Sequence, residues 1–227
     1  MINMLKILVI ADVHGEIEKI SKFLRNFKER DFDLVMCPGD FTDMFSTPEG
    51  YSQTDIAEIV LQKTLSLGKP VLCIPGNHEP YEILDLFDEY DVNLHSRSRK
   101  FKGFNFIGFG GASTPFNTKF EPTEEEIREN LHKFKSAPKG KTILMTHSPP
   151  HGTGMDRTEA GEHVGSKAIR KFIEREQPVL AISAHIHEAG GVDKIEGTTV
   201  FYPGAIFENF YGTVTIDKEV KCEIKKF

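Results

Sequence analysis

The chain carries five short clusters of metal-binding side chains, and each cluster directly follows an apolar run typical of a strand. In chain order the clusters are Asp12-Val13-His14, Gly39-Asp40, Gly76-Asn77-His78-Glu79, Thr146-His147 and Ala184-His185-Ile186-His187. The carboxyl ends of parallel strands meet at one edge of a sheet, so we expect these side chains to converge there. The pattern predicts an α/β protein that holds two metal ions at that edge.

Hydrophobic spacing predicts alternating strands and helices in the first part of the chain. Apolar runs at Leu5–Ala11, Leu34–Cys37 and Val71–Ile74 indicate strands buried on both faces. Between them, apolar residues recur at helical spacing over Ile17–Glu29 and over Ile56–Leu67. This β-α-β-α-β order is typical of a parallel sheet covered by helices.

The second part of the chain is predicted to mix hairpins, helices and strands. Further helices are expected at Tyr81–Tyr90, Glu121–Phe134 and Ser166–Glu176, and strands at Ile143–Thr146 and Val179–Ser183. The segment Phe101–Phe109 indicates a hairpin, the basic cluster Arg97–Lys102 a solvated turn, and the alternation over Val192–Ile224 antiparallel strands. Residues 1–227 are expected to form a single domain.

The amino-acid composition of the chain indicates which kinds of partner and which cellular compartment to expect. The formal charge of −6 and the pI of about 5.9 argue against a broad nucleic-acid interface, because such interfaces need clustered lysine and arginine. The apolar run within Met1–Ala11 is too short to span a membrane. The three cysteines lack C-x-x-C pairing and predict no disulfide framework. We therefore expect a cytoplasmic protein with no membrane partner, and a homodimer as the default assembly.

The first two clusters have both a metal-binding and a structural interpretation. Asp12 and His14 flank one residue, so in an extended segment both side chains leave the same face and can bind one ion. Alternatively, Asp12 caps the following helix. Gly39 permits a sharp turn that directs Asp40 into the crevice, where a carboxylate can bridge two cations. The alternative for Asp40 is an ordinary turn residue.

The remaining clusters supply an amide and several imidazoles. Asn77 offers an amide oxygen suited to a hard cation, while Glu79, before Pro80, is expected to cap the next helix. A lone histidine beside a strand is usually structural. Three of them at two strand ends, together with two aspartates and an asparagine at three more, favour metal ligation: His147, His185 and His187.

The ordered motifs Asp-x-His, Gly-Asp, Gly-Asn-His-Glu, His and His-x-His resemble the calcineurin-like metallophosphoesterase superfamily over Asp12 to about Gly204. The segments Thr146–Pro150 and His185–Glu188 additionally resemble the branch of metallophosphoesterase-domain (MPPED) and Icc-related small phosphoesterases. The resemblance implies a four-layer αββα sandwich with two facing mixed sheets.

The resemblance also implies a role for each ligand. The first ion would be held by Asp12, His14, Asp40 and His187, and the second by Asp40, Asn77, His147 and His185. His78 matches the family's catalytic histidine, and Asp43 the carboxylate that orients it in some members. Two positions depart from the family pattern: Ala184 stands where glycine is usual, and Tyr202 where asparagine is common. Tyr202 is expected near the mouth of the site or at a plain strand end.

The predicted function is a dinuclear-metal-dependent phosphoesterase. A hydroxide bridging the ions would attack phosphorus in line, with His78 assisting the leaving group. Phosphodiester hydrolysis of small or cyclic-nucleotide-like substrates is favoured; a phosphomonoesterase, a nuclease and a non-catalytic metal-bearing scaffold are the alternatives. The mixed nitrogen and oxygen donors suit Mn²⁺, Fe²⁺ or Zn²⁺ better than Cu(I). Of these we expect Mn²⁺, with Fe or Zn as possible alternatives. Arg157 and His151, in the long loop 148–165, are candidate substrate contacts, and Phe116 a candidate apolar wall.

Overall fold

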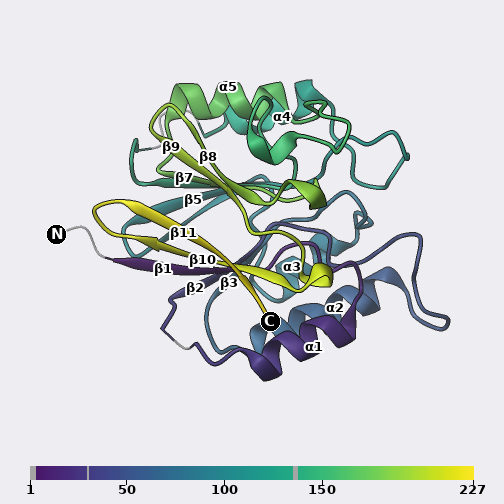
Figure 1. The fold of residues 1–227 in the computed structure, drawn as a ribbon. Coiled ribbons are helices and arrows are strands. Elements are labelled where there is room, and N and C mark those ends of the chain that lie inside the picture. Colours follow the sequence, from purple (N-terminus) through teal and green to yellow (C-terminus); the bar gives the residue numbers. More distant parts are fainter. Residues whose placement is uncertain (1–3, 30, 135–137) are drawn as a thin grey trace.

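Two β-sheets pack face to face, and helices cover the outer face of each (Figure 1). The computed structural model describes residues 4–29, 31–134 and 138–227, so Met1–Asn3, which precede the first apolar run, lie outside the described residues. The first sheet has the order β11 (Val220–Lys226), β10 (Phe210–Ile216), β1 (Leu5–Val9), β2 (Leu34–Cys37) and β3 (Val71–Cys73). The second has the order β4 (Arg97–Phe101), β5 (Phe104–Phe109), β6 (Thr142–Thr146), β7 (Leu180–Ile182), β9 (Thr198–Tyr202) and β8 (Gly191–Ile195).

Both sheets are mixed. β1, β2 and β3 run parallel, whereas β10 joins the free side of β1 in antiparallel register, with Leu5 opposite Ile216. In the second sheet β5, β6, β7 and β9 run parallel, and the edge strands β4 and β8 are antiparallel to their neighbours. The expected fold class, an αββα sandwich with two facing mixed sheets, is confirmed.

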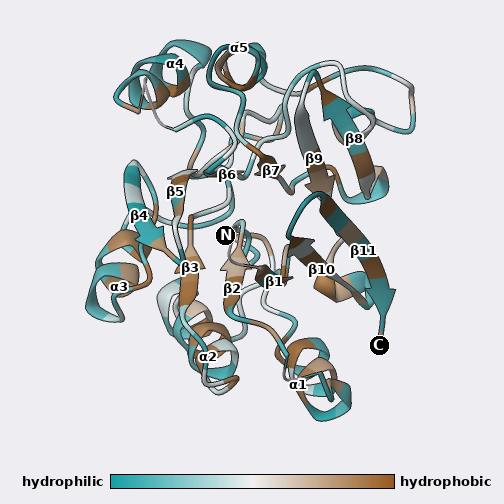
Figure 2. Ribbon diagram, turned by 90° about the vertical axis from the view of Figure 1, so that its left-hand side faces the viewer, coloured by the Kyte–Doolittle hydropathy of each residue, from teal (hydrophilic) through white to brown (hydrophobic). Residues whose placement is uncertain are grey.

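The period of two along each strand explains the layers. In β1, Leu5, Ile7 and Val9 point into the core between the sheets, while Leu8 packs with the helices of the outer layer. Both faces are therefore buried, which accounts for the nearly continuous apolar run at this strand. Figure 2 shows the hydrophobic strands between the two helical layers.

The helical layers are unequal. The described residues place α1 (Ile17–Asn26), α2 (Gln53–Leu65) and α3 (Ile83–Glu89) against the first sheet, and α4 (Glu124–His132) and α5 (Lys167–Glu176) against the second (Figures 1 and 2). Local sequence defines several starts, because Ser52, Thr123 and Ser166 cap α2, α4 and α5 with their hydroxyl oxygens. No helix within the described ranges has the length and hydropathy needed to cross a membrane.

Several boundaries differ from the sequence-based expectation, and two of the differences have a clear local cause. The basic segment from Arg97 is not a turn but strand β4, and the hairpin turns at Lys102 and Gly103. Charged side chains suit an edge strand because they discourage pairing with another chain, and here Arg97 pairs with Asp88. Helix α1 ends at Asn26 rather than Glu29, since Phe27 adopts extended backbone and stacks on Phe23.

Candidate metal centre

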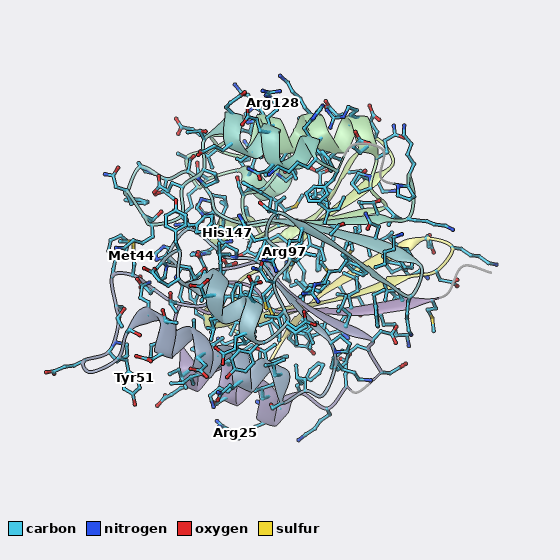
Figure 3. All side chains as sticks on the ribbon, turned by 180° about the vertical axis from the view of Figure 1, so that it is seen from behind. Arg25, Met44, Tyr51, Arg97, Arg128 and His147 are labelled. Carbon is cyan, nitrogen blue, oxygen red and sulfur yellow. The ribbon has the colours of Figure 1, made fainter. Side chains whose placement is uncertain are left out.

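The five clusters meet at one edge of the sandwich. Asp12, Asp40 and Asn77 follow β1, β2 and β3 of the first sheet, whereas His147 and the segment His185–His187 follow β6 and β7 of the second. Figure 3 shows His147 at the level between the two sheets. Each sheet therefore supplies one side of the site, as expected for carboxyl ends of parallel strands.

Left-handed backbone directs several of these side chains into the site. Asp12, His14 and Asp40 have φ near 50°, and His185 has φ of 82°. The expectation that Asp12 and His14 share a face of an extended segment is therefore wrong, because the chain turns at both residues. The turn is fixed by Asp40, whose carbonyl accepts from the N–H groups of Val13 (2.8 Å) and His14 (2.9 Å). Strained backbone of this kind is concentrated at functional sites.

The ligand atoms of Asp12, His14, Asp40 and His187 all lie within 4.8 Å of one another. His14 Nε2 is 3.3 Å from Asp40 Oδ2 and 3.2 Å from His187 Nε2. Asp12 is fully buried and does not cap α1, which begins after Glu16. Its Oδ1 atom has no hydrogen-bond partner among the described residues. A buried carboxylate oxygen without a donor is costly unless a cation binds it, so this group fits a metal ion.

A second group joins Asp40, His147 and His185, again with ligand atoms within 4.8 Å. His147 Nδ1 donates to the carbonyl of Pro38 (2.7 Å), which leaves Nε2 to face the site. That nitrogen lies 3.0 Å from Asn77 Oδ1 and 3.3 Å from Asp40 Oδ2. Lone pairs of His147 Nε2, Asn77 Oδ1 and Asp40 Oδ2 therefore point at one another, and a proton or a metal ion between them is needed to offset their repulsion.

Asn77 is held in the orientation that this group requires. Its side-chain Nδ2 donates to Thr118 Oγ1 (3.1 Å). Its main-chain carbonyl accepts from the N–H groups of Lys119 and Phe120, both at 3.0 Å. The amide oxygen is thereby directed toward His147. The loop after β5 therefore orients a ligand contributed by the other sheet.

Without a metal, charge within the cluster is balanced by protons. Burial disfavours protonated His14 and His147, but the Asp40 carboxylate outweighs it and raises the pKa of each imidazole to about 9. The same histidines hold the pKa of Asp40 well below its usual range, against the effect of burial. Burial and the neighbouring His147 lower the pKa of His185 to about 3, so that imidazole stays neutral and able to bind a cation.

His78 and Asp43 are brought together beside the cluster. His78 Nδ1 is 3.2 Å from Asp43 Oδ1, and the His78 ring meets the His14 ring edge-on with centroids 4.8 Å apart. Burial is the main cause of a lowered pKa at His78. The pair thus has the geometry expected of an oriented proton donor, and the catalytic roles of both residues stay predictions.

Glu79 has a different role from the predicted helix cap. It is fully buried, and its carboxylate accepts from the N–H groups of Gly76 (2.6 Å), Asp40 (3.0 Å) and Thr42 (2.9 Å). Burial and the nearby Asp40 charge raise the pKa of Glu79 to about 7. Glu79 therefore ties the ligand-bearing loops after β2 and β3 together. The sequence feature that could have indicated this role is the position of Glu79 within the Gly-Asn-His-Glu cluster.

Tyr202 ends strand β9, as the strand-end interpretation predicted, and it does not lie at the site mouth. The side chain is fully buried, and its hydroxyl donates to Asp12 Oδ2 at 2.7 Å. This hydrogen bond occupies one carboxylate oxygen and leaves Oδ1 facing the cluster. Ala184 keeps ordinary backbone, since the positive φ at this turn belongs to His185 instead.

The predicted substrate contacts lie in the loop after β6. His151 Nδ1 is 3.6 Å from Asp156 Oδ2, and Arg157 is exposed. Within the described part of the chain, no hydrogen bond or ion pair joins His151 or Arg157 to the ligand residues. Their contact with substrate stays a prediction.

Comparisons with known proteins give one family model and several relatives. The model of the calcineurin-like phosphoesterase family matches residues 5–189. The "Uncharacterized protein MJ1162" of Methanocaldococcus jannaschii is 36% identical over 210 residues, which cover 89% of each chain. The UPF0046 protein K07C11.7 of Caenorhabditis elegans is 26% identical over 218 residues, covering 88% of this chain and 69% of the relative.

Solved structures share the fold at low sequence identity. The protein TT1561 of Thermus thermophilus superposes with a TM-score of 0.74 at 17% identity, covering 99% of both chains. A dimetal phosphatase from Danio rerio superposes with a TM-score of 0.68 at 12% identity, covering 98% of this chain and 96% of that one. At such identities the likeness extends to the fold alone.

Proposed function

Because the chain belongs to the calcineurin-like phosphoesterase family, we propose that it is a phosphodiesterase that uses two divalent ions. Its substrates are small phosphodiesters, cyclic nucleotides among them. The family supports a phosphoester hydrolase, and the preference for diesters is the finer proposal.

One observation carries the dinuclear proposal: a single oxygen of Asp40 is shared between the two ligand groups. Asp40 Oδ2 lies 3.3 Å from His14 Nε2 and 3.3 Å from His147 Nε2. A carboxylate in that position can hold two adjacent cations at once. The first ion would be held by Asp12, His14, Asp40 and His187, and the second by Asp40, Asn77, His147 and His185.

When bound, two divalent ions supply activation of a water and charge balance for the phosphoryl oxygens. The chain's own residues do the rest. His78 holds a proton for the departing oxygen, and Asp43, at 3.2 Å, fixes the orientation of the imidazole. Phe207 packs against His14 and His187 with ring centroids 5.3 and 4.8 Å apart, which encloses one side of the cluster.

The charge around the cluster favours diesters over monoesters. A monoester is a dianion near neutral pH and benefits from arginine or lysine beside the metals. Among the residues that the structure describes, no lysine or arginine forms an ion pair with the ligand residues or with His78. A singly charged diester needs less positive charge. Oxygen and imidazole donors without thiolate favour Mn²⁺, with Fe or Zn as alternatives.

The test is hydrolysis of bis(4-nitrophenyl) phosphate and 4-nitrophenyl phosphate by metal-stripped protein titrated with Mn²⁺. We expect diester turnover to appear with metal and to saturate at two ions per chain. Asp40→Ala and Asn77→Ala should each lose about a hundredfold or more in kcat/KM, since each removes a metal ligand.

Asp31→Ala is the matched control, because Asp31 is an exposed carboxylate that pairs with Lys6 far from the cluster. It should retain wild-type turnover. Full activity in both ligand variants would refute the dinuclear mechanism. Turnover of the monoester alone would instead identify a phosphomonoesterase.

A further inference from the structure

Exposed aromatic side chains gather on the loops beside the metal centre. Among the described residues, the aromatic side chains that are more than half exposed are Phe45, Tyr51, Tyr81 and Phe116. All of them lie in segments that leave the carboxyl ends of β2, β3 and β5, the same sheet edge that carries the ligands. Large aromatic groups are usually buried, so their concentration at this edge indicates a surface that contacts a ligand.

Phe45 is the member of this set that touches the predicted catalytic group. Its ring meets the His78 ring edge-on with centroids 5.6 Å apart, and 65% of the side chain is exposed. Met44, its neighbour in the chain, lies at the periphery of the molecule (Figure 3).

The backbone of Phe45 is fixed relative to His78. The Phe45 N–H donates to Asp43 Oδ1 at 2.9 Å, and the same oxygen lies 3.2 Å from His78 Nδ1. Asp43 thus links the exposed ring to the imidazole that holds the proton. Phe207, on the other side of the cluster, is only half-buried but packs against ligand histidines and is less free to meet substrate.

We propose that Phe45 determines specificity by stacking on an aromatic ring carried by the leaving group of the diester. This inference rests on the proposed phosphodiesterase function. In hydrolysis the oxygen of water bonds phosphorus and one of its protons passes to solvent, while the bond from phosphorus to the leaving oxygen breaks. His78 gives its proton to the departing oxygen and recovers one from solvent. Since Phe45 contacts His78, a ring attached to that oxygen lies beside Phe45.

The shared chemistry of the ligand is a flat aromatic ring, either a nucleobase or an aryl group. Stacking of one base on an aromatic side chain contributes about tenfold or more in affinity. Edge-on contact, which is a geometry that aromatic pairs favour, joins Phe45 to His78. This contact leaves one face of the Phe45 ring free to stack on a ligand ring.

Comparing two cyclic phosphodiesters, one with a base and one without, distinguishes a loss of ring stacking from a loss of phosphodiester hydrolysis. Adenosine 2′,3′-cyclic phosphate and glycerol 1,2-cyclic phosphate share the same five-membered ester, but only the first carries a base. For Phe45→Ala we expect KM for the adenosine compound to rise about tenfold, with kcat within about twofold. KM for the glycerol compound should stay unchanged, and bis(4-nitrophenyl) phosphate serves as the aryl arm.

Calorimetry on the Mn²⁺-loaded protein gives a second readout. Phe45→Ala should weaken adenosine monophosphate binding about tenfold and leave inorganic phosphate binding unchanged. Phe45→Tyr keeps the ring and should restore wild-type affinity. Met4→Ala is the matched control, because Met4 is also an exposed apolar side chain but precedes β1, at the end of that strand opposite the ligand residues.

The inference is overturned if Phe45→Ala binds adenosine monophosphate as tightly as the wild type, or if it loses phosphate binding equally. A rise in KM for the glycerol compound equal to that for the adenosine compound would also overturn it. A wild-type protein that binds nucleotide through Phe45 but hydrolyses no ester would refute the proposed function and support the stacking contact.

Discussion

The hydroxyl of Tyr202 determines which oxygen of Asp12 is free to bind a cation. It donates to Oδ2 at 2.7 Å, and Oδ1 remains without a partner among the described residues. Groups that orient a metal ligand commonly contribute about ten- to a hundredfold to affinity. Tyr202 is the clearest such group on the first ion's side.

Tyr202→Phe removes only this hydroxyl and keeps the buried ring. We expect the affinity for the first ion to fall about ten- to a hundredfold, because Asp12 loses the donor that orients it. Competition with a chelating indicator measures the change. Tyr211→Phe is the control, since its hydroxyl bonds Glu29 on the outer layer. Unchanged affinity in Tyr202→Phe would show that the backbone alone positions Asp12.

Glu79→Gln tests how the two ligand loops are held together. The carboxylate accepts from backbone N–H groups of both loops, whereas an amide presents a donor to at least one of them. We expect the metal-free variant to lose about 2 kcal/mol or more of unfolding free energy, measured by urea denaturation at pH 8. Glu129→Gln, on the exposed face of α4, should change stability by less than about 0.5 kcal/mol. Equal stability in both variants would contradict the proposed role.

Among the elements, the long loop after β6 is organised by one buried carboxylate. Asp156 accepts from the N–H groups of Gly152, Thr153 and Gly165 and from His163 Nδ1 at 2.7 Å. Burial opposes the charged form, but these hydrogen bonds hold the pKa of Asp156 below its usual range. The stabilisation is therefore present above pH 3.8 and lost as the pH falls through the lower folded-state value.

Asp156→Ala should loosen this loop while the metal cluster stays intact. Trypsin cleavage after the exposed Arg157 should become about tenfold faster at pH 7.5, because local opening of the loop costs less free energy. Glu162→Gln, an exposed loop position, is expected to match the wild type. Cleavage at the wild-type rate in Asp156→Ala would show that other contacts, such as Arg170 with the carbonyl of His151, fix the loop.

At the scale of the whole molecule, protons and metal ions compete for the same cluster. His14 and His147 have folded-state pKa values of about 9, above the ordinary 6.5. Their contribution to the stability of the metal-free fold is complete below pH 6.5 and is lost as the pH rises through 9. Metal binding must displace these protons, since a ligand imidazole has to be neutral.

We therefore expect Mn²⁺ affinity to increase from pH 7 to 9, with proton release on binding. Calorimetry in two buffers of different ionisation enthalpy counts the protons. In parallel, the unfolding free energy of metal-free protein should fall between pH 6.5 and 9, while the Mn²⁺-loaded protein resists that loss. Binding without proton release at pH 7.5 would contradict the assignment of His14 and His147 as ligands.

The sequence predicts that the candidate ligands converge, because each follows an apolar run and the carboxyl ends of parallel strands meet at one edge. The two facing sheets were expected from the family resemblance. The sequence does not predict the left-handed backbone at Asp12 and His14, which depends on hydrogen bonds to Asp40 across a neighbouring strand. Nor does it predict the bond between Tyr202 and Asp12, since the register of distant strands decides it. Strand β4 was not predicted, because its run of charged residues at a sheet edge has the same sequence pattern as an exposed turn.

The antiparallel pairing of β10 with β1 has a consequence for the chain as the ribosome makes it. Val9 pairs with Gly212, so this edge of β1 stays unpaired until the ribosome has synthesised the chain through β10. Until then, β1 offers unpaired backbone groups to any other strand, which invites aggregation. The last of the candidate metal ligands, His187, emerges earlier than β10. A metal ion bound by these residues would therefore be able to join the two sheets while β1 is still open.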